Sequence, residues 1–233
     1  MRKEDIVELL EDTKESIYSI EKNYIEAIND ESVKSTLKVR VKNCLENLRS
    51  CLDYISCDVY EKYYKKKAKN IYFPYGKSKQ DFESNLNKKF KDLKDKSKDI
   101  YDIIESIQPY KCGDSWLVNL CLFTNKNKHD NLSKQKREDF STLYVNNIKL
   151  AKVGKGSSIS FSGCTFGNIH QGGDIKIQDR ELILNGKINC DINKIDWVNF
   201  KFENTDIDIL ELLKVSYREI NILKDKIYNI LIK

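Results

Sequence analysis

The chain has 233 residues, of which 40% are hydrophobic and 33% charged, and its formal net charge is +5. This composition is typical of a folded protein and argues against a disordered chain. The sequence contains no run of about 18 apolar residues, so it predicts no membrane-spanning helix. The charged, periodic N-terminus lacks the apolar segment of a secretion signal, and we therefore expect a cytoplasmic protein of one or two domains.

The seven cysteines are an odd number and form no CxxC pair, which predicts reduced thiols rather than a disulfide framework. Cys44 and Cys51 lie on an apolar helical stripe, so we expect them to act as small core residues. The remaining Cys and His candidates do not build a four-ligand zinc site, because their spacings are wide or they offer a single pair: Cys112, Cys121 and His129, and Cys164 with His170. We expect no metal and no cofactor.

Apolar residues recur at three- and four-residue steps through the first 66 positions. The pattern predicts one helix over 3–28 and a second over 32–66, separated by a short polar break. A short turn between two long amphipathic helices favours an antiparallel hairpin. In this hairpin we expect burial of Leu9, Ile17, Leu45, Leu48 and Leu52.

The next segment contains shorter helices with clear boundary signals. Pro74 marks a turn, and Ser78 followed by Asp81 has the chemistry of a helix N-cap. A further helix is predicted near 97–107, where Gln108-Pro109 stops it. An apolar helix over 116–124 then leads into a polar cluster at 125–129.

Beyond about Asp139 the glycine content rises and the apolar residues alternate with a period of two. These features predict antiparallel strands around 148–150, 159–161, 175–177, 182–184 and 198–202, with Asn185-Gly186 as a hairpin turn and another turn at 154–158. A final helix is predicted over 207–231, and we expect one face of the sheet to pack on it. The predicted fold is therefore α+β, with a helical bundle over 1–138 and a small antiparallel sheet closed by the C-terminal helix over 139–233.

The polar cluster Asn125-Lys126-Asn127-Lys128-His129 is the main candidate for chemistry, and it holds one of the two histidines of the chain. Imidazole titrates near neutrality and lysine neutralises phosphate, so the cluster fits binding or cleavage of a phosphodiester. We assign His129 and Asn125 as candidate catalytic residues. The alternative is structural, because a histidine at a helix C-terminus caps free carbonyl groups.

A lysine-rich segment is the second candidate. Between Lys62 and Lys98 there are thirteen lysines and four acids, a net charge of +9. Nearby aromatic residues are available to stack on unpaired bases: Tyr63, Tyr64, Tyr72, Phe73 and Tyr75. The candidate nucleic-acid-binding residues are Lys62, Lys65, Lys66, Lys67, Lys69, Lys126 and Lys128. The alternative is a solvated helix face in a lysine-rich protein.

The helix end at Asn125 and His129 resembles the signature of HEPN nucleases, in which Arg, a polar residue, three further residues and His close a helix. The arginine of that signature corresponds to Thr124 here. The resemblance implies a dimeric helical bundle that acts on RNA without a metal. The segments LRSCLDYIS (48–56), Phe73-Pro74, IQPY (107–110) and Leu122 to Leu132 also resemble a group of bacterial and phage-associated proteins of unassigned activity.

From these patterns we expect a non-catalytic module that binds RNA or a protein partner, in phage defence or a toxin-antitoxin setting. Homodimerisation through the helical part is expected, and membrane binding is not. One alternative is a metal-independent ribonuclease in which His129 is the general acid/base and Asn125 orients the phosphate. A second alternative is a scaffold whose long helices self-associate.

Overall fold

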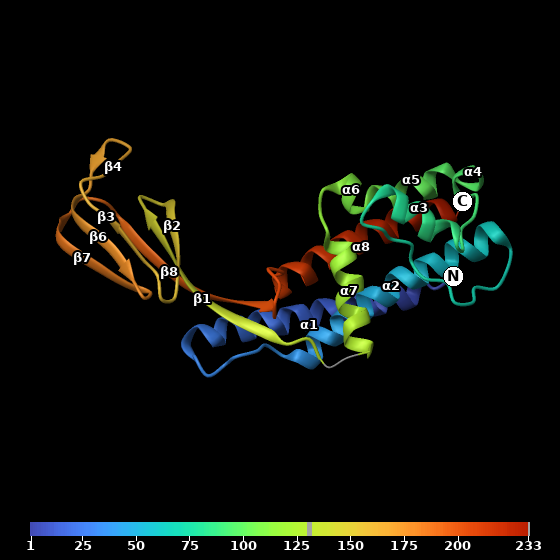
Figure 1. The fold of residues 1–233 in the computed structure, drawn as a ribbon, viewed down its shortest axis with the longest axis horizontal. Coiled ribbons are helices and arrows are strands. Elements are labelled where there is room, and N and C mark those ends of the chain that lie inside the picture. Colours follow the sequence, from blue (N-terminus) through green and yellow to red (C-terminus); the bar gives the residue numbers. More distant parts are fainter. Residues whose placement is uncertain (130–131, 233) are drawn as a thin grey trace. The chain divides into compact units, whose positions relative to one another are not determined.

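A computed structural model describes residues 1–129 and 132–232, without the side chains of residues 127–129. The described chain divides into two compact units (Figure 1). The helical unit comprises Met1–Ile20, Leu37–Lys134 and the chain from Ile209, and the β unit comprises Glu21–Thr36 and Gln135–Asp208. The order of N-terminal helices, central antiparallel strands and a C-terminal helix confirms the predicted α+β class.

The helices follow the predicted order, with two short additions. They are α1 (Lys3–Asn29), α2 (Lys38–Tyr64), α3 (Lys79–Asn87), α4 (Leu93–Lys96), α5 (Lys98–Ser106), α6 (Pro109–Cys112), α7 (Trp116–His129) and α8 (Ile209–Leu231). Ser78 and Asp81 form the reciprocal capping box at the start of α3, which confirms the N-cap prediction. The helix that opens at Trp116 runs five residues past its predicted end and includes the polar cluster.

The first part of α1 and α2 form the predicted antiparallel pair. Cys51 Sγ donates a hydrogen bond to Ile6 O at 3.8 Å, and Asn47 Nδ2 donates to Asp12 Oδ2 at 2.8 Å. Ile17, Leu45, Leu48 and Leu52 are buried as expected, whereas Leu9 is only half-buried. The second helix starts six residues later than predicted, after Leu37 in a left-handed conformation.

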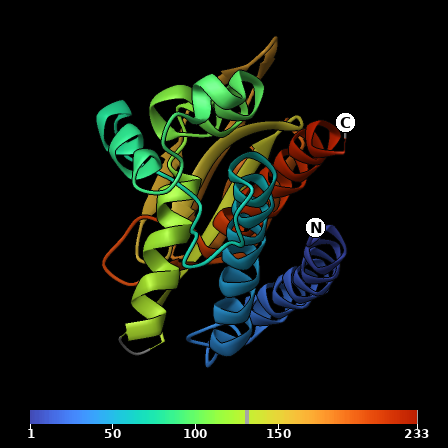
Figure 2. The same ribbon diagram turned by 90° about the vertical axis from the view of Figure 1, so that its right-hand side faces the viewer.

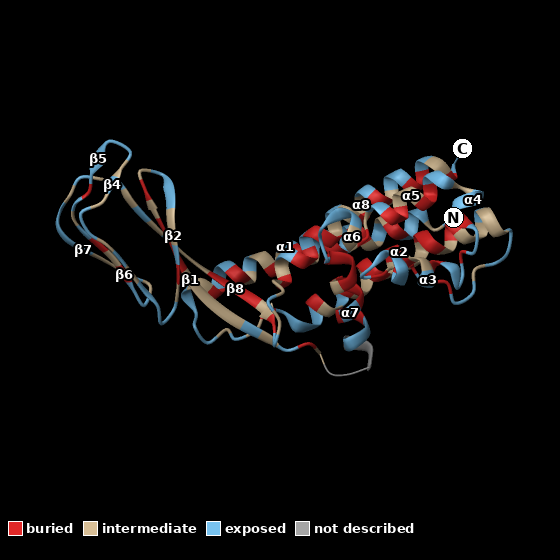
Figure 3. Ribbon diagram, turned by 45° about the horizontal axis from the view of Figure 1, so that its top comes forward, coloured by how far each residue is buried: buried red, intermediate tan, exposed pale blue. Residues whose placement is uncertain are grey.

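The C-terminal helix α8 packs against α2, α5 and α7. The expectation that its apolar stripe packs on the sheet is therefore wrong, since that stripe packs against other helices in the core of the helical unit. Figure 3 shows buried residues along α2, α7 and α8, and Figure 2 shows α2 and α7 side by side. No helix in the described chain is both long and apolar enough to cross a bilayer.

A buried charge network joins α2 and α8 to the start of the chain. The Asp58 carboxylate is fully buried; it accepts a hydrogen bond from Arg2 Nη1 at 2.6 Å and another from the Tyr228 hydroxyl. Arg2 also pairs with Glu61 at 3.0 Å. Lys62 Nζ donates to Leu231 O at 2.9 Å and so satisfies a carbonyl at the end of α8.

The β unit contains two three-stranded antiparallel sheets, ordered β2-β1-β8 and β3-β6-β7, and the small hairpin β4-β5. The strands are β1 (Gln135–Val145), β2 (Ile148–Gly154), β3 (Ser158–Phe161), β4 (Thr165–Phe166), β5 (Ile169–His170), β6 (Gly172–Gln178), β7 (Glu181–Ile188) and β8 (Ile192–Phe202). Their shared core is an apolar cluster of Leu143, Val145, Val153, Ile175 and Ile177. The turn at 154–158 joins β2 to β3, which lie in different sheets, so it is not a hairpin.

The hairpin turns of the β unit lie elsewhere than predicted. Asn146-Asn147 and Asp179-Arg180 have positive φ at both positions, as a type I′ turn requires. Asn185-Gly186 lies inside β7, and its assignment as a turn is wrong. At this point the ladder with β6 shifts register, and a Cβ on Gly173 would meet Asn185 O at 2.0 Å.

Arg137 of β1 closes the C-terminal end of α1 within the β unit. Its guanidinium donates to Ala27 O, Asp30 O and Val33 O at 2.6 to 2.9 Å. It also pairs with Asp139 at 2.7 Å. All seven cysteines are free, as predicted, and Cys44 and Cys51 are buried.

Candidate functional site

The predicted catalytic pair lies at the end of α7. His129 is the last residue of this helix, and its side chain, like that of Lys128, lies outside the described residues. Asn125 and Lys126 are exposed one turn earlier. Asn125 is therefore the member of the pair whose side-chain surroundings the structure describes.

Asn125 lines an open pocket of about 530 Å³, which we call the Arg49 pocket. Its walls come from α2, the segment before α3, α3 itself and α7. The lining residues are Arg49, Tyr72, Phe73, Pro74, Tyr75, Asn85, Lys88, Lys89 and Asn125. The lysines predicted from the sequence, Lys62 to Lys69, are not among them: Lys62 is engaged at the end of α8, and Lys65, Lys66, Lys67 and Lys69 are exposed near the end of α2.

The segment that shapes the pocket is held by one fully buried glutamine. Gln108 Nε2 donates to Pro74 O at 3.3 Å and to Ile104 O at 3.0 Å, and its Oε1 accepts from Gly76 N at 3.1 Å. A side chain at Gly76 is excluded, since its Cβ would lie 2.2 Å from Phe82 N. The backbone of this segment is therefore fixed on its inner side.

Two more side chains, from α2 and α3, hold the backbone of the same segment. Asp53 Oδ1 accepts from Phe73 N at 2.8 Å, and Asn85 Nδ2 donates to Tyr75 O at 2.9 Å. Thus α2 and α3 each provide one polar side chain that hydrogen-bonds to the backbone of residues 73–75. A wall held at each residue is preorganised, and such a wall lowers the entropic cost of binding.

Arg49 forms the floor of the pocket. Arg49 is 9% exposed, and its guanidinium pairs with Asp53 at 3.2 Å and contacts Cys121 Sγ. The ring of Tyr75 lies over it, with the guanidinium carbon 5.4 Å from the ring centroid. Burial raises the pKa of Cys121 to about 11, so this residue is a neutral thiol near pH 7 and not a nucleophile.

Tyr75 joins Arg49 to Asn125. Burial raises the pKa of the Tyr75 hydroxyl, and a hydrogen bond with the Asn125 side chain acts in the opposite direction. Tyr75 therefore contacts the arginine on α2 through its ring and the amide on α7 through its hydroxyl, although 76 positions of sequence separate these two residues.

The lining of the pocket is cationic. Arg49, Lys88 and Lys89 carry three positive charges, and none of the lining residues is acidic. Lys88 Nζ donates to Asn85 Oδ1 at 2.8 Å, so it is directed along the rim. Tyr72 is 61% exposed and offers an open ring at the mouth. Together these groups suit a ligand with a phosphate and a flat base.

Sequence reasoning missed Arg49 and Asn85 as site residues, whereas Lys88 and Lys89 lie in the predicted lysine-rich segment but were not among its named candidates. Arg49 lies in the segment LRSCLDYIS (48–56), where the sequence pattern predicts only that it belongs to an amphipathic helix. Phe73, expected to stack on bases, is only 2% exposed, so that assignment is wrong. Tyr64 stacks on Tyr60 instead, with ring centroids 4.9 Å apart.

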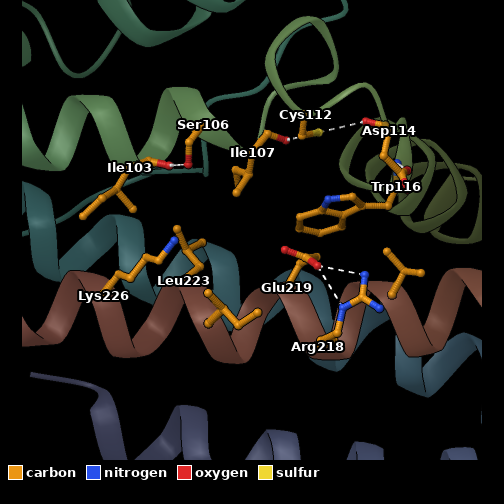
Figure 4. Close-up of a pocket in the computed structure, with 12 residues that line it drawn as sticks. Ile103, Ser106, Ile107, Cys112, Asp114, Trp116, Arg218, Glu219, Leu223 and Lys226 are labelled. Carbon is orange, nitrogen blue, oxygen red and sulfur yellow. Dashed lines mark hydrogen bonds and ion pairs between the residues drawn. The ribbon is translucent and has the colours of Figure 1, made fainter.

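A second cavity of about 440 Å³ lies between α5, α8 and the start of α7 (Figure 4). Its walls are largely apolar: Ile103, Ile107, Trp116 and Leu223 face it. The charges around it balance, and Arg218 pairs with Glu219 at 2.9 Å. This cavity lacks the excess positive charge of the Arg49 pocket.

The described residues contain no cluster of three or more His, Cys, Asp or Glu that could hold a metal ion. No family model, no curated protein and no solved structure matches the chain. The likeness to HEPN nucleases stays a prediction based on Asn125 and His129.

Proposed function

We propose that this protein binds single-stranded RNA in the Arg49 pocket. The observation that carries the proposal is the meeting of Arg49 and Asn125 at Tyr75. In the HEPN signature an arginine directly precedes the position of Asn125. Here that position is Thr124, which is fully buried and donates to Leu120 O at 2.6 Å. Arg49, from another helix, places a guanidinium against the ring of the same tyrosine whose hydroxyl hydrogen-bonds with Asn125.

Arg49 keeps donors for a ligand. A guanidinium has five N–H groups. Asp53 accepts from Nε and forms an ion pair at Nη2, and Cys121 accepts from Nη1, so two N–H groups have no partner among the residues that the structure describes. A phosphate at the floor would accept from these donors, and Lys88 and Lys89 at the rim would neutralise it.

The tyrosines favour an unpaired strand over a duplex. Base stacking requires an exposed π-face, and paired bases offer none along a helix. Tyr72 is open at the mouth, and the Tyr75 ring is fixed above Arg49. Asn125 would then donate and accept at a base edge, or donate to a phosphate. The bacterial phage-defence or toxin-antitoxin setting, a protein partner and a homodimer through the helical unit remain predictions.

The test measures fluorescence anisotropy of a labelled single-stranded RNA of about 12 nucleotides. Three neutralised phosphates predict an affinity loss of about 18-fold between about 50 and 200 mM salt. The double variant Lys88→Glu/Lys89→Glu should lower affinity by more than about tenfold. The matched variant Lys66→Glu/Lys67→Glu makes the same charge change outside the pocket and should lower it less.

Equal loss in both double variants would contradict the pocket and support diffuse attraction to the lysine-rich segment. An RNA affinity that does not change with salt concentration would contradict an ionic site. Cleavage of the RNA in the absence of metal would favour the ribonuclease alternative at His129. Light scattering over a dilution series would reveal self-association without RNA binding, as the scaffold alternative requires.

A further inference from the structure

The outer face of the sheet β2-β1-β8 carries an aromatic pair. The strand registers place Gly154, Phe140 and Trp197 side by side in one row across the sheet. Leu143, Val145 and Val153 point to the other face, where they form the apolar core. Because side chains alternate along a strand, Phe140 and Trp197 face away from that core.

The pair is fixed in orientation. The rings of Phe140 and Trp197 are stacked, with centroids 4.7 Å apart and an interplanar angle of 25°. Trp197 Nε1 donates to Thr142 Oγ1 at 2.9 Å, which sets the direction of the indole. Gly154 carries no side chain to cover the Phe140 ring, whose nearest atom lies 3.6 Å from an added Cβ. A rigid aromatic pair on a sheet surface loses little entropy when a flat ligand stacks on it.

A lysine completes the pair. Lys152 Nζ lies 3.8 Å from the Phe140 centroid and 4.3 Å from the Trp197 centroid. Burial lowers the pKa of this ammonium, with a smaller contribution from Lys201. Lys152 is an exposed residue on a flexible stem, so its charge can move from the rings to an adjacent phosphate.

The charges of this face have one dominant sign. The register places Lys136, Lys149, Lys152 and Lys201 on the side of Phe140. The same rows hold one acid, Glu138, which pairs with Lys201 at 3.1 Å, and Asp206 from beyond β8 also pairs with Lys201 at 3.3 Å. The outer face is therefore an aromatic pair within a positive field, which is complementary to exposed bases on a phosphate backbone.

We propose that the Phe140–Trp197 face of the β unit is a second contact surface for single-stranded RNA. A base stacks on the aromatic pair while Lys149 and Lys152 neutralise the flanking phosphates. The proposal takes its ligand class from the function proposed above, but it uses none of the residues of the Arg49 pocket.

The tryptophans make this site directly observable. The chain has two tryptophans, and Trp116 is 3% exposed in the helical unit. In a Trp116→Phe background the emission comes from Trp197 alone. Titration with single-stranded oligoadenylate RNA should give a saturable loss of this emission, because base stacking quenches indole fluorescence. Inorganic polyphosphate of similar length should leave the emission nearly unchanged.

Two sets of variants separate this site from the pocket. Lys149→Glu/Lys152→Glu should lower the RNA affinity measured from the Trp197 emission by roughly tenfold. Lys187→Glu, which replaces an exposed lysine on β7, should leave this affinity nearly unchanged. The loss of emission should persist in Lys88→Glu/Lys89→Glu, even if the Arg49 pocket does not bind RNA. An unchanged Trp197 emission with RNA, or an equal loss with polyphosphate, would overturn the proposal. Equal RNA affinities of Lys149→Glu/Lys152→Glu and Lys187→Glu would also overturn it.

Discussion

Replacement of Gln108 by alanine should loosen the wall of the Arg49 pocket and destabilise the helical unit. The side chain is fully buried, donates two hydrogen bonds and accepts one. Alanine would leave Pro74 O and Gly76 N without their side-chain partner in a buried place. Each buried polar group left without a partner costs about 1–3 kcal/mol. For these two groups together we expect a loss of about 2–6 kcal/mol in the free energy of unfolding.

Urea denaturation followed by the emission of Trp116 in a Trp197→Phe background reports on the helical unit alone. The control is Gln80→Ala, which truncates an exposed glutamine on α3 and should change stability by less than about 0.5 kcal/mol. RNA affinity should fall with Gln108→Ala and stay unchanged with Gln80→Ala. A loss below about 1 kcal/mol for Gln108→Ala would refute the assigned role of these hydrogen bonds.

Three further predictions concern other parts of the helical unit. Asp58→Ala should lower the free energy of unfolding by about 1.5–3 kcal/mol in urea melts, because Arg2 and Tyr228 lose a buried charged acceptor; no loss would refute the network. Burial raises the pKa of Tyr64 from 10 to about 12, with smaller contributions from Asp92 and Tyr60. The neutral phenol therefore contributes its full stabilisation below pH 10, and this contribution is lost as the pH rises to about 12. Stability should therefore decline less steeply above about pH 10 in Tyr64→Phe than in the wild type, and parallel declines would contradict this. Electrophoresis of labelled RNA without metal should show no cleavage by either the wild type or His129→Ala; cleavage that the substitution abolishes would make the ribonuclease alternative correct.

Local patterns were sufficient to predict most of the helical unit. The three- and four-residue stripes predicted α1, α2 and α8, because each of these helices buries one face. They did not identify the partner of α8, since an apolar stripe is equally suited to a sheet or to other helices. That choice depends on packing with α2, α5 and α7.

The β unit was harder to predict where polar residues face inward. β1 was missed because its first half, Gln135 to Asp139, has no apolar alternation. Arg137 and Asp139 are instead used to close the end of α1. Asn185-Gly186 carries a strong local hairpin signal, but the register of β6 and β7 places it in a bulge. Tertiary pairing outweighs turn propensity at that point.

The Arg49 pocket could be predicted only in part. Asn125 and the tyrosines were identified from their residue types and charged neighbours. Arg49 was not identified, because its place in the same pocket as Asn125 depends on the packing of α2 against α7. It also depends on Gln108, which fixes the segment around Pro74. No spacing in the sequence carries that information.

Photo-crosslinking of single-stranded RNA that contains 4-thiouridine, followed by trypsin digestion and mass spectrometry, tests the central claim most directly. Cleavage after Lys69 and Lys77 releases residues 70–77, NIYFPYGK, which include Tyr72 and Tyr75. We predict an RNA adduct on this peptide in the wild type that is lost in Lys88→Glu/Lys89→Glu. Adducts confined to other peptides, or no adduct under conditions where RNA binds, would contradict RNA binding in the Arg49 pocket.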